Sequence, residues 1–470
     1  MSQSAVGERA LGGLELAHEN IQKLVDYGVR EFVICPGSRN QPLLNILLNE
    51  PKLKIWYGFE ERSCAFFALG RIRQTKRPVA IVVTSGTAVG ELLPAAMEAY
   101  YTSLPLVLLT ADRPERCRHL NTPQTCDQDN IFGIYAQEIY EWDGRQPVHV
   151  NVRFEEPARK FVSTLALNFD NEIVPKVPVG SYDKLLEFYN KVKQPLVIVS
   201  TLREVRAAKA FLLQLNATLY IEGTSQLRED PDLETLRTNN PTLHKVDGVL
   251  RIGGVPTHRI WRDLDDLDLP VLSITNSPFS GVTNGEFVHT EIEPYLQNAP
   301  VHHYEPQFTS IEYPLNKEES TIRSISEWAP PHSLIYLGNS LPIREWDKAA
   351  TSEQKHFKIE ASRGLNGIDG QISTFLGLCD PKRHNIGIFG DMTTLYDLQA
   401  LWHLQSLSPP NIQIIVINNS GGMIFEPMYH KEEMLNRHNL SFKGWAEMFN
   451  IDYATSLEDP SGRKVIELKI

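Results

Sequence analysis

Two apolar runs in the last third of the chain end in polar residues that could hold a cation. Asp391 ends the run 384–391, and Asn419 ends the next run, 411–419, with Gly421 two residues later. Mg²⁺ prefers octahedral oxygen ligands and commonly joins one or two protein oxygens to substrate phosphates. The Asp391 carboxylate, the Asn419 side chain and the Gly421 carbonyl could therefore clamp a diphosphate. The same residue types also form ordinary turns at strand ends, so the pattern alone leaves both interpretations open.

An acidic pair stands at the start of a helical pattern in the first third. Glu60 and Glu61 directly precede the apolar run of GFEERSCAFFALG (58–70). Carboxylates in the first turn of a helix interact favourably with its dipole. Taken by itself, the pair is best interpreted as a helix cap.

The elements that would position these residues alternate between short apolar runs and amphipathic stretches, which predicts βαβ units with parallel sheets. Ligands collect at the carboxyl ends of such strands. Helices are expected at 17–28 and 41–49. The clearest expected strands are 31–35, 78–86, 104–112, 195–200, 217–222, 248–254, 269–275, 333–340, 384–391, 411–419 and 463–469. A linker is expected around 168–182. The prediction is three doubly wound α/β domains, at 1–175, 183–318 and 319–470.

Composition excludes several classes of partner. The formal net charge is −12, from 46 Lys+Arg and 58 Asp+Glu, without a basic run, so neither nucleic acid nor an anionic membrane is expected as a partner. The five cysteines lack metal-ligand spacing and predict buried thiols in a reducing compartment. The N-terminus lacks the pattern of a signal peptide, and no apolar run approaches the roughly 20 residues of a membrane helix. We expect a cytoplasmic protein without membrane insertion.

The Gly-Asp and Asn-Asn pairs resemble the thiamine-diphosphate motif, with Met392 where many members have glycine. Eight blocks in order resemble the 2-succinyl-5-enolpyruvyl-6-hydroxy-3-cyclohexene-1-carboxylate synthase family of menaquinone or phylloquinone biosynthesis. They are PGSRNQPL (36–43), GFEERSCAFFALG (58–70), TSGTAV (84–89), LTADRPE (109–115), GNSLPIRE (338–345), SRGLNGIDGQISTFLG (362–377), GDMTTLYDLQAL (390–401) and NNSGGMIF (418–425).

This resemblance implies a transferase that uses thiamine diphosphate with Mg²⁺ or Mn²⁺. It would decarboxylate 2-oxoglutarate and add the succinic-semialdehyde carbanion to isochorismate. Glu61 matches the glutamate that activates the cofactor, while Asp391, Asn419 and Gly421 match the metal ligands. Further cofactor contacts are implied at Ile368, Met392, Thr393, Ile424 and Phe425. The first domain would bind the pyrimidine of the cofactor, and the third would bind its diphosphate. The second would be a middle domain between them in the sequence.

The resemblance also implies substrate contacts and an assembly. Arginine forks suit carboxylate substrates. The implied substrate-binding residues are Ser38, Arg39, Arg113, Gln124, Ser340, Arg344 and Arg363. In this family one cofactor meets residues from two subunits, so a homodimer or a tetramer is expected.

Three departures from the family pattern bear on activity. Pro123 replaces an asparagine, the family usually has a lysine near His258, and the stretch after Phe425 is short and lacks a last helix before the closing strand 463–469. An imidazole at 258 would be mostly neutral at pH 7. Two alternatives stay open. One is another thiamine-diphosphate carboligase or 2-oxo acid decarboxylase, because scaffold does not fix substrate. The other is a non-catalytic paralogue.

Overall fold

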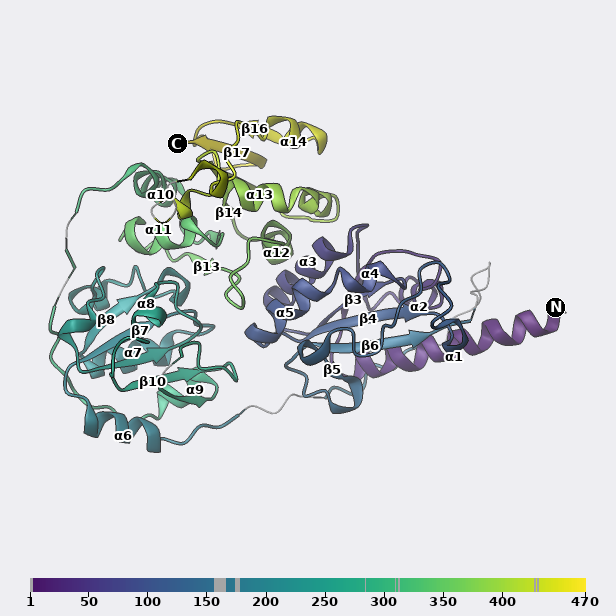
Figure 1. Cartoon of the computed structure of the whole chain (residues 1–470), viewed down its shortest axis with the longest axis horizontal. Helices are drawn as coiled ribbons and strands as arrows, with labels where there is room; N and C mark the ends of the chain where they lie inside the picture. The colour runs from purple at the N-terminus through teal and green to yellow at the C-terminus, as the bar shows by residue number, and fades with distance from the viewer. Residues whose placement is uncertain are drawn as a thin grey trace. The chain divides into compact units, whose positions relative to one another are not determined.

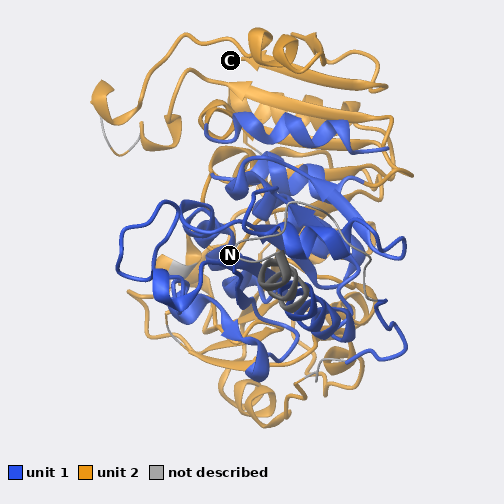
Figure 2. Cartoon of the chain, turned by 90° about the vertical axis from the view of Figure 1, so that its right-hand side faces the viewer, with its two compact units in different colours: residues 1–176, 369–379, 396–408 blue, residues 177–368, 380–395, 409–470 orange. Residues whose placement is uncertain are grey.

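The computed structural model describes residues 3–155, 166–173, 178–283, 285–308, 310–311, 313–426, 428 and 431–470. Within these residues the strands form three parallel sheets (Figure 1), which confirms the expected α/β fold class. By its internal contacts the chain divides into two compact units (Figure 2). Unit 1 comprises 1–176, 369–379 and 396–408, and unit 2 comprises 177–368, 380–395 and 409–470.

The sheet of unit 1 has the strand order β2-β1-β3-β4-β6-β5. Its strands are β1 (Glu31–Ile34), β2 (Lys54–Tyr57), β3 (Val79–Val83), β4 (Leu106–Asp112), β5 (Gln137–Glu138) and β6 (Val148–Arg153). Its helices are α1 (Gln3–Asp26), α2 (Gln41–Leu47), α3 (Glu61–Thr75), α4 (Thr87–Gly90) and α5 (Leu93–Thr102). Strands β3 and β4 are buried along their whole length, as continuous apolar runs in a parallel sheet should be.

The first sheet of unit 2 has the strand order β11-β10-β9-β7-β8. Its strands are β7 (Pro195–Val199), β8 (Thr218–Ile221), β9 (Gly248–Ile252), β10 (Val271–Thr275) and β11 (Glu286–His289). The accompanying helices are α6 (Asp183–Lys191), α7 (Arg206–Leu215), α8 (Ile260–Asp263) and α9 (Ile292–Gln297). Apolar side chains from β7 and α7 share one buried core, which fixes this layer.

The second sheet of unit 2 has the strand order β13-β12-β14-β15-β17-β16. Its strands are β12 (Leu334–Leu337), β13 (Lys358–Glu360), β14 (Asn385–Gly390), β15 (Ile412–Asn418), β16 (Asp452–Ala454) and β17 (Arg463–Lys469). Its helices are α10 (Lys317–Trp328), α11 (Leu341–Ala349), α13 (Asp391–Tyr396) and α14 (Lys443–Met448). Gly390 pairs with Ile417, so β14 and β15 end side by side.

Two later segments of the chain belong to unit 1. They carry α12 (Gln371–Leu378) and the 3-10 helix Leu398–Gln405, and α12 packs on α3. The two helices approach each other closely where they cross. A Cβ added to Gly70 would lie 2.1 Å from the Thr374 carbonyl oxygen, and one added to Gly377 would lie 2.2 Å from the Phe67 carbonyl oxygen. Only glycine on both helices permits this approach.

Several sequence expectations can be compared with these elements. The helix expected at 17–28 corresponds to α1, which begins earlier, at Gln3, and ends at Asp26. The linker expected at 168–182 has neither helix nor strand in its described residues, and 174–177 lie outside them. Cys35, Cys64 and Cys379 are buried thiols as expected, but the expectation is wrong for half-buried Cys117, at the end of a 3-10 helix, and for exposed Cys126, in a loop. Among the described helices, none is long and apolar enough to cross a membrane.

Candidate active site

Asp391 lies where β14 passes into α13 and is 2% exposed. Its Oδ1 accepts a hydrogen bond from the Met392 amide at 2.6 Å, and its Oδ2 accepts one from the Gly421 amide at 2.9 Å. His438 Nε2 lies 3.2 Å from the same Oδ2. Burial raises the pKa of Asp391, although the amide hydrogen bonds act in the opposite direction. The carboxylate is thus fixed at the end of the strand.

The two asparagines after β15 have different surroundings. Asn418 is buried and donates to Glu467 Oε1 at 2.7 Å and to the Leu440 carbonyl at 3.0 Å. Its side chain therefore connects the end of β15 to β17 and to the segment before α14. Asn419 donates from Nδ2 to Glu318 Oε1 at 2.8 Å. Its Oδ1 is buried without a hydrogen-bond partner among the described residues. A buried acceptor of this kind costs free energy unless a ligand satisfies it.

Gly421 follows in a backbone conformation that only glycine adopts easily, with φ +142°. A Cβ there would lie 2.6 Å from the Leu435 oxygen. Its carbonyl accepts a hydrogen bond from the Met423 amide at 2.9 Å, which leaves one lone pair for a further partner. Any side chain at 421 would displace the turn that follows β15.

The three predicted ligands therefore occupy the ends of two adjacent parallel strands. A carboxylate, an unsatisfied amide oxygen and a backbone carbonyl are all hard oxygen donors, which suits Mg²⁺ or Mn²⁺. The described residues contain no cluster of three or more His, Cys, Asp or Glu side chains that could hold a metal. The donor set at Asp391, Asn419 and Gly421 thus fits a cation that keeps positions open for phosphate oxygens.

Four of the predicted cofactor contacts lie within a few residues of these ligands in the sequence, and the fifth, Ile368, lies earlier. Met392 is half-buried and Thr393 is buried, both in the first turn of α13. Ile424 is half-buried and Phe425 exposed, both in a short 3-10 helix after Gly421. Ile368 is half-buried in the loop that follows β13.

Three predicted substrate residues lie in unit 2. Ser340 precedes α11 with φ +74°, and its carbonyl accepts a hydrogen bond from the half-buried Arg344. Arg363 is 7% exposed and donates to Asn339 Oδ1 and to the Pro256 carbonyl, both at 3.0 Å. The Arg363 guanidinium is thus held in place by two neighbouring residues of unit 2.

Glu61 is the first residue of α3 in unit 1. The preceding Glu60 supplies the cap, because its side chain accepts a hydrogen bond from the Ser63 amide at 2.8 Å. Burial raises the pKa of Glu61. The capping interpretation therefore applies to Glu60, while Glu61 is left half-buried and more readily protonated than an ordinary glutamate.

The other predicted residues of unit 1 lie in loops after its strands. Arg39 is 6% exposed and donates to the carbonyls of Phe154 and Glu155. Arg113 Nε donates to the Pro123 carbonyl at 3.0 Å, so the proline that departs from the family pattern still anchors an arginine through its backbone.

Ser38 and Gln124 complete this set. Both side chains are exposed, and Gln124 adopts φ +55°, with its carbonyl accepting from Ser85 Oγ at 2.8 Å.

His258 is half-buried in the loop between β9 and α8. Burial lowers the pKa of this imidazole below its usual value. Its backbone amide donates to the buried Glu222, and its ring contacts Tyr220 with centroids 5.5 Å apart. The structure thus agrees with the expectation that histidine at this position does not replace a lysine charge.

Sequence reasoning missed two groups of residues that support the site. Glu318, 101 residues before Asn419, and Glu467 on β17 are not near the motif in sequence. In unit 1, Ser373 joins α12 to α3 by contacting Ser63 Oγ at 2.7 Å and Asp397 at 2.9 Å. Alternation of apolar runs gives no signal for such long-range polar contacts.

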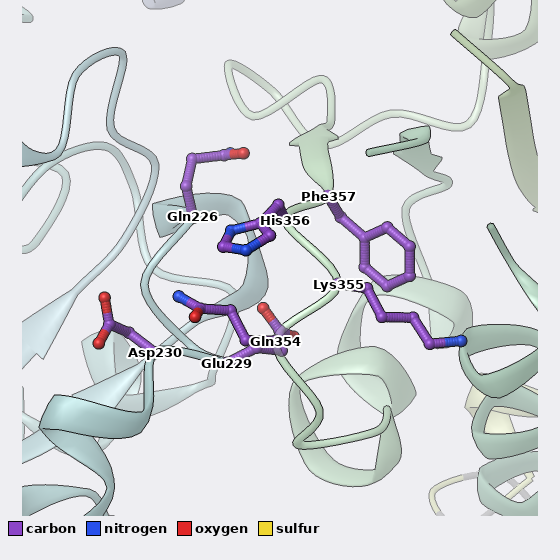
Figure 3. A pocket seen from close by; sticks show the side chains of 7 residues that line it. All are labelled: Gln226, Glu229, Asp230, Gln354, Lys355, His356 and Phe357. Carbon is purple, nitrogen blue, oxygen red and sulfur yellow. The ribbon is translucent and has the colours of Figure 1, made fainter. Parts of the chain in front are cut away.

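Unit 2 also has a small pocket that contains none of the predicted site residues. It is lined by Gln226, Glu229, Asp230, Gln354, Lys355, His356 and Phe357 (Figure 3). Glu229 pairs with Arg228 at 2.9 Å and Asp230 with Lys209 at 2.7 Å, so these carboxylates are already neutralised. The Lys355 ammonium points away from them (Figure 3) and donates to backbone carbonyls. These contacts indicate a structural role for the residues that line the pocket.

Comparison with known proteins decides the family. Residues 15–131 match the model of the thiamine pyrophosphate enzyme N-terminal TPP binding domain. The chain is 40% identical to 2-succinyl-5-enolpyruvyl-6-hydroxy-3-cyclohexene-1-carboxylate synthase of Bdellovibrio bacteriovorus, over 97% of this chain and 94% of that one. The chain belongs to this synthase family. It is also 36% identical to the synthase of Akkermansia muciniphila, over 91% and 89% of the two chains.

Solved structures support the fold of the family. Benzoylformate decarboxylase from Polynucleobacter necessarius superposes with a TM-score of 0.73 at 14% identity, covering 97% of this chain and 98% of that one. A putative thiamin diphosphate-dependent enzyme from Mycobacterium smegmatis gives 0.72 at 15% identity, covering 97% and 99%. The chain is therefore a thiamine-diphosphate enzyme and, as a member of the synthase family, a transferase that acts on small molecules.

Proposed function

We propose that this chain decarboxylates 2-oxoglutarate and joins the remaining four-carbon unit to isochorismate, giving 2-succinyl-5-enolpyruvyl-6-hydroxy-3-cyclohexene-1-carboxylate and carbon dioxide. The observation that carries the proposal is the oxygen-donor set at the ends of β14 and β15 in a chain of this family. Asp391, Asn419 and Gly421 would hold Mg²⁺ or Mn²⁺, which would bind the diphosphate. When bound, thiamine diphosphate supplies the electron sink for decarboxylation.

Glu61 would hold a proton at the pyrimidine ring nitrogen of the cofactor. A carboxyl whose pKa is raised by burial keeps its proton at a higher pH, so it can donate this hydrogen bond. Ile368, Met392, Thr393, Ile424 and Phe425 would line the cofactor. Arg39, Arg113, Arg344 and Arg363, with Ser38, Gln124 and Ser340, would bind the carboxylates of the two substrates.

The proposal includes domains and assembly. Residues 1–175 would bind the pyrimidine, 183–318 would form the middle domain, and 319–470 would bind the diphosphate. A homodimer, or a tetramer of two dimers, would bring Glu61 of one chain to the metal site of another. Exposed aromatic residues flank Glu61 in unit 1: Phe59 is 55% exposed and contacts Trp402, which is 39% exposed. Exposed apolar surface of this kind suits a subunit interface. The five unpaired cysteines suit the proposed cytoplasmic location.

Mass spectrometry of the reaction products tests the proposal. Purified chain with thiamine diphosphate, Mg²⁺, 2-oxoglutarate and isochorismate should yield the adduct, whereas pyruvate in place of isochorismate should not. Loss of carbon dioxide without adduct would contradict the acceptor assignment. Cofactor binding with neither product would indicate a non-catalytic paralogue.

A further inference from the structure

Asn419 can ligate a cation only through Oδ1, because an amide nitrogen carries two hydrogens and lacks a free lone pair for the metal. The two ends of the amide have nearly the same shape, so packing alone does not choose between them. An outside partner has to fix the orientation. In this structure Nδ2 lies 2.8 Å from Glu318 Oε1, and Oδ1 is buried without a partner among the described residues.

A carboxylate has the chemistry for this choice. An ionised glutamate only accepts hydrogen bonds, so it pairs with the NH₂ end of the amide and would repel the oxygen end. With Nδ2 held by Glu318, Oδ1 of Asn419 must face the other way. Outer partners that orient ligands in this manner are a general part of metal sites.

The position of Glu318 is itself rigid. It is the second residue of α10, between residues of a capping box: Asn316 Oδ1 accepts from the Glu319 amide at 2.8 Å, and Glu319 Oε2 accepts from the Asn316 amide at 2.9 Å. Glu318 thus presents a fixed acceptor to a residue 101 positions later.

We propose that Glu318 is a positioning residue of the cation site, which orients the Asn419 amide so that Oδ1 serves as the ligand. This role rests on the proposed function, because it requires that Asn419 binds the metal of the thiamine-diphosphate site. Glu318 would not contact the cation itself.

Titration with Mn²⁺ in the presence of thiamine diphosphate, followed by electron paramagnetic resonance of the free ion, tests the role. Glu318→Ala should raise the Mn²⁺ dissociation constant about 10-fold or more. Glu318→Gln keeps an acceptor for Nδ2 but can also donate to Oδ1, so its dissociation constant should lie between those of wild type and Glu318→Ala. Glu327→Gln is the matched control, since Glu327 is an exposed glutamate on the same helix, and it should bind like wild type.

Repeating the Glu318→Gln change in the Asn419→Asp variant makes the test independent of folding effects. In Asn419→Asp the side chain has only acceptors, so Glu318 becomes a repelling neighbour. Adding Glu318→Gln should then tighten Mn²⁺ binding, opposite in sign to its effect on the wild type. With Mg²⁺, Glu318→Ala and Glu318→Gln should each raise the concentration for half-maximal activity and leave kcat at saturating Mg²⁺ within about twofold, because the ligand Asn419 is retained.

The outcomes separate the two levels of the argument. Wild type that fails to bind Mn²⁺ would overturn the proposed cation site and Glu318's role with it. Wild type that binds, with Glu318→Ala equal to Glu327→Gln, would overturn the positioning role alone. Equal weakening by Glu318→Ala and Glu318→Gln would show that charge, and not the hydrogen bond to Asn419, matters.

Discussion

At the scale of single residues, burial changes the acid–base behaviour of carboxyl groups in both units. Asp397 is fully buried in unit 1, and burial raises its pKa to about 7, against the hydrogen bonds from Ser373. Its oxygens accept from the Ser373 amide at 2.8 Å and from Ser373 Oγ at 2.9 Å. Ser373 in turn contacts Ser63, two residues after Glu61. The protonation state of Asp397 therefore bears on the packing of the helix that carries Glu61.

This raised pKa predicts how stability depends on pH. The folded chain binds the Asp397 proton more tightly than the unfolded chain, so its stabilising effect is complete below the unfolded pKa of about 4 and is lost as pH rises through about 7. Wild type should lose about 1 kcal/mol of unfolding free energy between about pH 6 and pH 8 through this group.

Asp397→Asn is neutral at every pH and can keep both contacts to Ser373. It should flatten this part of the profile, as measured by urea unfolding. An unchanged slope in the variant would show that Asp397 does not titrate in this range.

At the scale of elements, α3 and α12 cross with backbone nearly touching backbone at Gly70 and Gly377. Gly377→Ala would place a methyl group against the Phe67 carbonyl and should destabilise unit 1 by about 1–3 kcal/mol. In contrast, Gly444→Ala on α14 meets no atom within 4 Å and should stabilise slightly. Thermal unfolding of both variants checks the opposite signs, and an unshifted midpoint for Gly377→Ala would show that the helices separate at no cost.

The runs expected from the sequence include most inner strands of the three sheets and the edge strand β8, but they omit the inner strand β6 and most of the edge strands. The run 104–112 contains β4, which is buried along its whole length, because buried parallel strands are continuously apolar. The edge strands β2, β5, β13 and β16 are short and partly exposed, so their composition resembles that of loops.

The same contrast holds at the site. The sequence predicts the places of Asp391, Asn419 and Gly421 after strand ends, whereas their role as metal ligands stays a prediction. Glu318 and Asp397 act through contacts that depend on tertiary folding, which no local pattern reveals.

At the scale of the whole molecule, we propose that the active site is built from two chains. The proposed partners of one cofactor, Glu61 and Asp391, belong to unit 1 and unit 2 respectively. We propose that they meet across a homodimer, with the exposed Phe59 and Trp402 beside Glu61 covered by the second chain. If so, each active site depends on residues from both chains, and neither chain alone completes one.

Mixing two inactive variants tests this central claim most directly. Glu61→Gln and Asp391→Ala should each give almost no adduct alone, because one lacks the proton-holding carboxyl and the other a metal ligand. After unfolding and refolding together, half of the dimers should be mixed, and each mixed dimer should contain one intact site. Adduct formation should then return to about a quarter of the wild-type rate. A mixture as inactive as its components, or full activity of Glu61→Gln alone, would contradict the account.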